Sequence, residues 1–235
     1  MTAPIRILAF GASIIEGFYS NEFGGMMRPH PMTKQLGVRL RERFPQLQFE
    51  IINAGNEGEC AVQMPHRLER LLSRDDKFDF AIFHAGTNDF ARATPAGHGF
   101  LGSFERLDDD AVSKHAEEVS SAVFAALVQM ASMCADRRVH TVLNSLLHSG
   151  YEYKDAFDFR HFTFARRQLC EKLRAFATDN ASSCTFFDLG EVVPFGDDYY
   201  AEDIHLNPTG YDRFGDFMFS VLAPLIEQRL IQNTE

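Results

Sequence analysis

The N-terminal segment reads Ile5-Arg6-Ile7-Leu8-Ala9-Phe10-Gly11-Ala12-Ser13-Ile14-Ile15-Glu16-Gly17. Ile5–Phe10 is a short apolar run that predicts a buried strand, and a glycine turn follows it directly. A serine between two glycines at the carboxyl end of a strand places a hydroxyl at the sheet edge where α/β folds bind ligands. Taken alone, the segment is equally typical of a serine that caps a helix after a glycine turn.

Further along the chain, short apolar runs alternate with segments of helical period, which is the pattern of βαβ units. The pattern predicts strands at Ile5–Phe10, Leu47–Asn53, Phe78–His84, Val139–Asn144 and Cys184–Leu189, with long loops at Phe18–Met32, Ala91–Leu107 and Leu147–His161. Helices are expected at Thr33–Phe44, Val62–Ser73, Phe162–Thr178 and Pro208–Leu230, with a long core helix between Asp108–Asp110 and Arg137–Arg138. We therefore expect a three-layer α/β sandwich in which helices cover both faces of a parallel sheet of about five strands. Residues 1–235 contain no linker or repeat and are interpreted as one domain.

Composition excludes several classes of function. The formal net charge is −10 with no dense Lys/Arg block, so nucleic acid is not an expected partner. The four cysteines are scattered, without the spacing of a zinc site, so we expect no zinc site built on them. We expect no apolar stretch to reach the roughly 18–20 residues that span a bilayer. The N-terminus does not resemble a signal peptide, so the expected location is cytoplasmic. The sequence leaves the oligomeric state open.

Three more polar segments follow predicted strands or precede the last helix. Ile51–Cys60 contains glycines whose backbone N–H groups can approach a ligand closely, although glycine-rich β-to-α turns are common. His84-Ala85-Gly86-Thr87-Asn88-Asp89 offers an amide that can donate to a developing negative charge, or serve only an Asx turn. Glu202-Asp203-Ile204-His205-Leu206-Asn207-Pro208 places an imidazole beside carboxylates at the start of a helix, or forms a plain acidic surface turn.

The four segments together, in this order, resemble the SGNH (GDSL-like) hydrolase family. The similarity extends from Ile7 to Tyr211 and implies a flavodoxin-like fold. Position by position, the resemblance implies that Ser13 is the nucleophile and His205 its base. It further implies that the Ser13 and Gly58 backbone N–H groups and the Asn88 side chain form an oxyanion hole.

Two positions depart from the family pattern. Ala12 occupies the place of the aspartate in the name-giving GDSL signature. The usual DxxH spacing puts the triad acid at Glu202, where the family has aspartate, while Asp203 lies one residue closer to His205. Spacing favours Glu202, but a sharp turn before Asn207 could present either carboxylate.

The resemblance implies a serine hydrolase that cleaves a small-molecule carboxylic ester through an acyl-enzyme, a mechanism that requires neither a metal nor an organic cofactor. A carboxylesterase, a sugar O-acetylesterase, a lysophospholipase and a thioesterase all remain open within this interpretation. A catalytically inactive binding module on the same fold is an alternative that the departure at Ala12 suggests. A nucleotide-binding α/β domain is disfavoured, because neither GxGxxG nor GxxxxGK[ST] follows any predicted strand.

Overall fold

The computed structural model describes residues 3–19, 29–74, 77–92, 108–150, 160–201 and 204–232. Its five strands form one sheet in the order β2-β1-β3-β4-β5, and every pairing is parallel. The strands are β1 (Ile5–Gly11), β2 (Phe49–Gly55), β3 (Phe80–His84), β4 (His140–Asn144) and β5 (Cys184–Phe187). The predicted five-stranded parallel sheet is confirmed.

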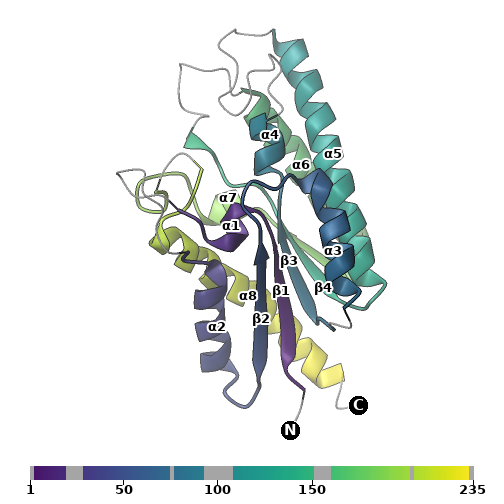
Figure 1. Cartoon of the computed structure of the whole chain (residues 1–235), viewed down its shortest axis with the longest axis vertical. Coiled ribbons are helices and arrows are strands. Elements are labelled where there is room, and N and C mark those ends of the chain that lie inside the picture. Colours follow the sequence, from purple (N-terminus) through teal and green to yellow (C-terminus); the bar gives the residue numbers. More distant parts are fainter. Residues whose placement is uncertain are drawn as a thin grey trace.

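Helices cover both faces of this sheet (Figure 1). One face packs against α3 (Met64–Leu72), α5 (Asp109–Ala135) and α6 (Arg160–Asp179), and the other against α2 (Met32–Arg43) and α8 (Pro208–Gln232). Successive residues of β3 alternate between the two cores, because side chains of a strand point to opposite faces: Ala81 and Phe83 join the first, Phe80 and Ile82 the second. The three-layer prediction is therefore confirmed.

Short helices were not predicted from the sequence. These are α1 (Ser13–Glu16), α4 (Thr87–Arg92) and α7 (Leu189–Val192). Segments of four to six residues are too short to show a helical period, so their hydrophobic pattern carries no signal. The predicted helix Val62–Ser73 begins as the 3₁₀ turn η1 (Ala61–Gln63) and continues as α3. Most of the three predicted loops lies outside the described residues, and Ala91 and Arg92 belong to α4 rather than to a loop.

The expectation that no stretch is long enough to span a bilayer needs correction for α5. By length and composition alone, Asp109–Ala135 passes that test. The helix nevertheless packs against α6 and α3, and its buried stripe belongs to a core cluster, as expected for a central helix. Its start is as predicted, since the Asp108 side chain caps it by accepting the Ala111 N–H at 2.8 Å.

The strand order positions the functional residues. The chain leaves β1 through α2 on one face and leaves β2 through α3 on the other, so the winding direction changes between β1 and β3. In open parallel sheets, ligands bind outside the carboxyl ends of the strands at such a switch point. Ser13 directly follows β1 and Asn88 follows β3, so both lie at this place.

Candidate active site

Ser13 begins α1 just after β1, which lies between β2 and β3 in the sheet. Gly11 ends that strand, and a Cβ there would lie 2.2 Å from the His84 carbonyl oxygen, so only glycine allows β1 and β3 to approach this closely. Ala12 precedes the helix without a side-chain cap. The Ser13 N–H belongs to the first helical turn, whose N–H groups have no acceptor within the helix and can face a ligand. The serine is 8% exposed.

His205 is fixed by its neighbours on both sides. Tyr200 and Leu206 form an antiparallel bridge, and the His205 carbonyl accepts the Ala201 N–H at 3.0 Å. Asn207 caps α8, as predicted, because its Oδ1 accepts the Gly210 N–H at 2.9 Å. The imidazole therefore extends from a bridged turn that is anchored to a long helix.

The fold brings these two side chains together. His205 Nε2 lies 3.0 Å from Ser13 Oγ, although 192 positions separate the residues in sequence. The Phe18 ring meets the imidazole edge-on, with 4.8 Å between the ring centroids. The Tyr211 hydroxyl donates a hydrogen bond to the Phe18 carbonyl at 2.6 Å. Glu202 and Asp203, the two predicted candidates for the triad acid, lie outside the residues that the structure describes.

Gly58 lies in the loop that follows β2, and Asn88 lies in the short helix α4 that follows β3. Gly58 has a φ of 72°, a left-handed conformation that favours glycine. The Asn88 side chain is 8% exposed, and its Nδ2 donates to the Glu59 carbonyl at 3.0 Å. Because an amide nitrogen carries two hydrogens, this bond orients the group and leaves a second hydrogen available.

Asp89, also on α4, makes a second contact with the segment that follows β2. Its Oδ2 accepts the Ala61 N–H at 2.7 Å and so caps the 3₁₀ turn that leads into α3. Burial raises the pKa of this carboxyl, and its backbone hydrogen bonds only partly oppose the rise. The sequence interpretation gave Asp89 no more than a local turn, whereas the structure shows it bonded across 28 positions of sequence.

Arg67 on α3 was not predicted from the sequence. Its guanidinium donates to the Gly11 carbonyl at 2.9 Å, to the Ala54 carbonyl at 2.7 Å and to Glu59 Oε2 at 2.7 Å. It also lies 3.9 Å from the centroid of the Phe10 ring. One side chain thus ties the ends of β1 and β2 to the residue whose carbonyl orients the Asn88 amide. The sequence carried one indication that Arg67 is partly buried, because it lies next to the apolar stripe that Met64, Leu68 and Leu72 form on α3.

His84 is a second residue near the site to which the sequence pattern gave no role. It ends β3, is 1% exposed, and its pKa is lowered to about 4 because burial disfavours the charged imidazolium. The ring faces Phe214 of α8, with centroids 6.3 Å apart. The imidazole is therefore neutral at physiological pH and adds no positive charge beneath the site.

No cluster of three or more His, Cys, Asp or Glu side chains that could hold a metal ion occurs in the part of the chain that the structure describes. The described site contains a hydroxyl hydrogen-bonded to an imidazole, an oriented amide, and backbone N–H groups beyond the ends of β1 and β2. This set suits transfer of an acyl group.

The family model described as GDSL-like Lipase/Acylhydrolase family matches residues 9–213. This chain belongs to that family. As a GDSL-like acylhydrolase, it is a hydrolase that acts on ester bonds. The matched region begins within β1 and ends within the first turns of α8, so it contains Ser13, Gly58, Asn88 and His205.

Solved structures resemble this GDSL-like chain in fold. A carbohydrate acetylesterase from Sinorhizobium meliloti has a TM-score of 0.63 at 16% identity, covering 94% of this chain and 99% of its own. An aryl esterase from M. smegmatis has a TM-score of 0.60 at 18% identity, with coverage of 94% and 99%. A GDSL-like lipase from Bacteroides thetaiotaomicron has a TM-score of 0.58 at 17% identity, with coverage of 94% and 88%. Among curated proteins, none matches the chain in sequence.

Proposed function

We propose that this GDSL-like hydrolase cleaves a carboxylic ester through a covalent acyl-enzyme on Ser13. The observation that supports this proposal most directly is the 3.0 Å separation of Ser13 Oγ and His205 Nε2. A hydroxyl is a weak nucleophile at neutral pH, and an imidazole within hydrogen-bonding reach makes it competent by accepting its proton as it attacks. The pair stands at the switch point of the sheet, where such folds bind ligands.

In the proposed first half-reaction, Ser13 Oγ bonds to the ester carbonyl carbon while its proton passes to His205 Nε2. The tetrahedral intermediate then collapses, the bond to the leaving oxygen breaks, and His205 returns the proton to the departing alcohol. Water repeats the two steps on the acyl-enzyme, which releases the carboxylic acid and restores the serine. Glu202 or Asp203 is proposed to hold the imidazole in the productive tautomer.

The oxyanion hole is proposed to consist of the Ser13 and Gly58 N–H groups and the Asn88 amide. Three features support this assignment: the first-turn position of Ser13, the left-handed conformation of Gly58, and the bond from Asn88 to the Glu59 carbonyl. That bond links α4 to the loop that follows β2, so the Asn88 donor is oriented before the substrate arrives. Preorganised donors of this kind need no rearrangement as charge develops.

Asn88→Ala should lower kcat by about a hundredfold or more with little change in KM, because loss of one oxyanion donor costs about 2.7–4 kcal/mol of barrier. Steady-state kinetics on p-nitrophenyl acetate would measure the effect. Asn88→Asp is the matched variant, since it keeps the size of the side chain but removes the donor and adds a negative charge. It should be at least as impaired, and wild-type kcat in either variant would remove Asn88 from the oxyanion hole.

The two candidate acids can be separated by parallel substitution. Of Glu202→Gln and Asp203→Asn, one should lower kcat severely and the other mildly, because only one carboxylate can orient the imidazole. An effect of about 10⁴-fold is typical where the triad acid becomes an amide. Equal, mild losses would mean that neither residue orients His205.

A fluorophosphonate probe tests the proposal against a catalytically inactive binding module. Such probes phosphonylate an activated serine, so mass spectrometry of the wild-type protein should find the adduct on the peptide that contains Ser13. His205→Ala should label far more slowly, because Ser13 then lacks its base. A protein that stays unlabelled, while a known serine esterase reacts in parallel, would support the inactive module instead.

For the substrate, we propose a short acyl ester. The Phe18 ring packs edge-on against His205, and a bulky ring at this position favours a small acyl group over a large one. The structural neighbours that are titled carbohydrate acetylesterase and aryl esterase suggest a sugar or aryl leaving group. A panel of p-nitrophenyl esters of increasing chain length, run beside an acetylated sugar and a thioester, would distinguish the alternatives. We further propose that residues 1–235 act as one domain in the cytoplasm, where its four free cysteines would stay reduced.

A further inference from the structure

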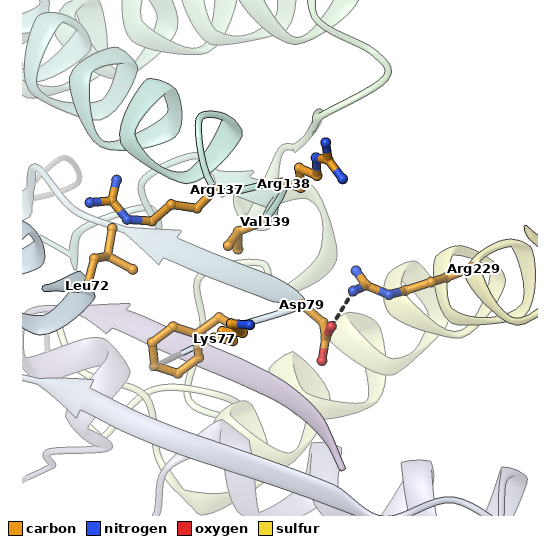
Figure 2. A pocket seen from close by; sticks show the side chains of 8 residues that line it. Leu72, Lys77, Asp79, Arg137, Arg138, Val139 and Arg229 are labelled. Atoms are coloured by element: carbon orange, nitrogen blue, oxygen red, sulfur yellow. Dashed lines mark ion pairs between the residues drawn. The ribbon is translucent and has the colours of Figure 1, made fainter. Parts of the chain in front are cut away.

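Figure 2 shows a pocket of about 750 Å³ at the amino edge of the sheet. Ser13 follows the carboxyl end of β1, so it lies at the opposite edge. The pocket lies where α3 and α5 end, where β3 and β4 begin and where α8 approaches its last turn. Four cationic side chains line it, namely Lys77, Arg137, Arg138 and Arg229. Because the whole chain carries a formal charge of −10, this concentration of positive charge opposes the general electrostatics of the molecule.

Among the described residues that line the pocket, Asp79 is the one carboxylate, and it already has two partners. Asp79 accepts the Arg6 backbone N–H at 2.7 Å and forms an ion pair with Arg229. The same Arg229 guanidinium lies 5.9 Å from the centroid of the Phe80 ring. Asp79 therefore fixes Arg229 in place, and Arg229 keeps further N–H groups for a second acceptor, since a guanidinium has five donors.

Lys77 and Arg138 are exposed, and neither side chain pairs with a carboxylate among the residues that the structure describes. The Arg137 guanidinium donates to the Met133 carbonyl at 3.1 Å. The pocket thus offers three cations with unused donors beside a fourth that is held rigidly, above walls formed by Leu72 and Val139.

The backbone at Arg138 gives an independent indication. Arg138 has a φ of 59°, the single positive value outside glycine in the described chain. It follows α5 in a Schellman turn, in which the Val139 N–H bonds to the Cys134 carbonyl at 3.0 Å. Glycine is the favoured residue at this position, and a residue with a side chain costs about 1 kcal/mol there. Residues held in such conformations cluster at functional sites.

A second pocket of about 370 Å³ shares Arg138 and Arg229 with the first. Polar side chains also line it, including His140, Ser182 and Gln228. The two arginines therefore stand between two adjoining hollows, so an anionic group bound by them could extend a neighbouring part into either one. Hollows of these sizes suit a small molecule.

We propose that Lys77, Arg138 and Arg229 form a binding site for the phosphate groups of a small soluble molecule, separate from the esterase site. Arginine binds phosphate through paired N–H donors, and a lysine adds a point charge with three more donors. A hollow between the ends of several helices and strands favours a compact soluble phosphorylated compound over an extended polyanion. The site makes no use of Ser13 or His205, so the proposal stands independently of the proposed catalytic mechanism.

Inorganic pyrophosphate is the probe, titrated by calorimetry into the full-length protein at low, constant ionic strength because salt screens exposed charges. We expect saturable one-to-one binding with a Kd below about 1 mM, and Arg138→Gly should weaken it at least tenfold, the loss expected for one charge-assisted contact. Arg138→Gly should also raise the Tm by roughly 2–4 °C, because glycine relieves the left-handed backbone. Weak binding by this variant then cannot result from misfolding.

Three controls decide the interpretation. Lys34→Gln removes an exposed cation on α2, outside the pocket, and should leave the Kd unchanged. Ser13→Ala should bind pyrophosphate as the wild-type does. Sedimentation with phosphatidylglycerol vesicles should show no more binding than with phosphatidylcholine vesicles. The proposal is overturned if pyrophosphate does not bind saturably, if Arg138→Gly and Lys34→Gln have the same Kd, or if only anionic vesicles bind.

Discussion

Ser13→Ala should reduce turnover of p-nitrophenyl acetate by about 10⁴-fold or more while the protein remains folded. The substitution removes the only atom that can form the acyl-enzyme, and it leaves His205 without a proton to accept. What remains is binding plus the oxyanion donors, which gives only a small residual rate. The Tm should change little, because the change removes one oxygen from a side chain that is already in a close-packed site.

Ser220→Ala is the matched control for this experiment. Ser220 lies on the exposed side of α8 and donates only to the Phe217 carbonyl of its own helix at 2.7 Å. Its kcat/KM should equal the wild-type value. If Ser13→Ala kept more than about a hundredth of the wild-type activity, ester hydrolysis in this protein would not proceed through Ser13.

Arg67→Met should destabilise the protein by about 3 kcal/mol, because removing one partner of a largely buried ion pair leaves the other charge without compensation. Glu59, whose side chain is 9% exposed, would lose its counterion, and the Ala54 carbonyl would lose the guanidinium donor. Methionine retains much of the volume, so the effect reports on the polar contacts rather than on a cavity. Urea unfolding followed by circular dichroism would measure the loss.

Arg70→Met, at an exposed position of the same helix, is the control and should change stability by less than about 0.5 kcal/mol. The double variant Glu59→Met/Arg67→Met should recover part of the loss, since neither charge is then left alone. The folded fraction of Arg67→Met should also have a lower kcat, because the Glu59 carbonyl that orients Asn88 is no longer held. If Arg67→Met were as stable as Arg70→Met, Arg67 would not hold the ends of β1 and β2 together.

The sequence predicted the strands well because each is a short apolar run between turn residues. Observed and predicted strand ends differ by at most two residues, and the parallel order follows from the alternation of strands and helices. The long helices were also predictable: α5 has a capping aspartate, and α8 has Asn207 followed by proline. The short helices α1 and α4 were missed, although Ser13 and Asn88 belong to them, because four to six residues show no period.

By itself, the sequence determined which residues end the strands and which chemistry they bring: a serine after the first strand, an asparagine after the third and a histidine before the last helix. Only the tertiary structure decided that Ser13 and His205 meet, because they stand 192 positions apart in the sequence. Parallel pairing places the carboxyl ends of the strands at one edge of the sheet, where the two residues come together. Arg67 was equally beyond the sequence. Its partners on β1, on β2 and in the following loop become neighbours only after the sheet has formed, so no local pattern of residues encodes them.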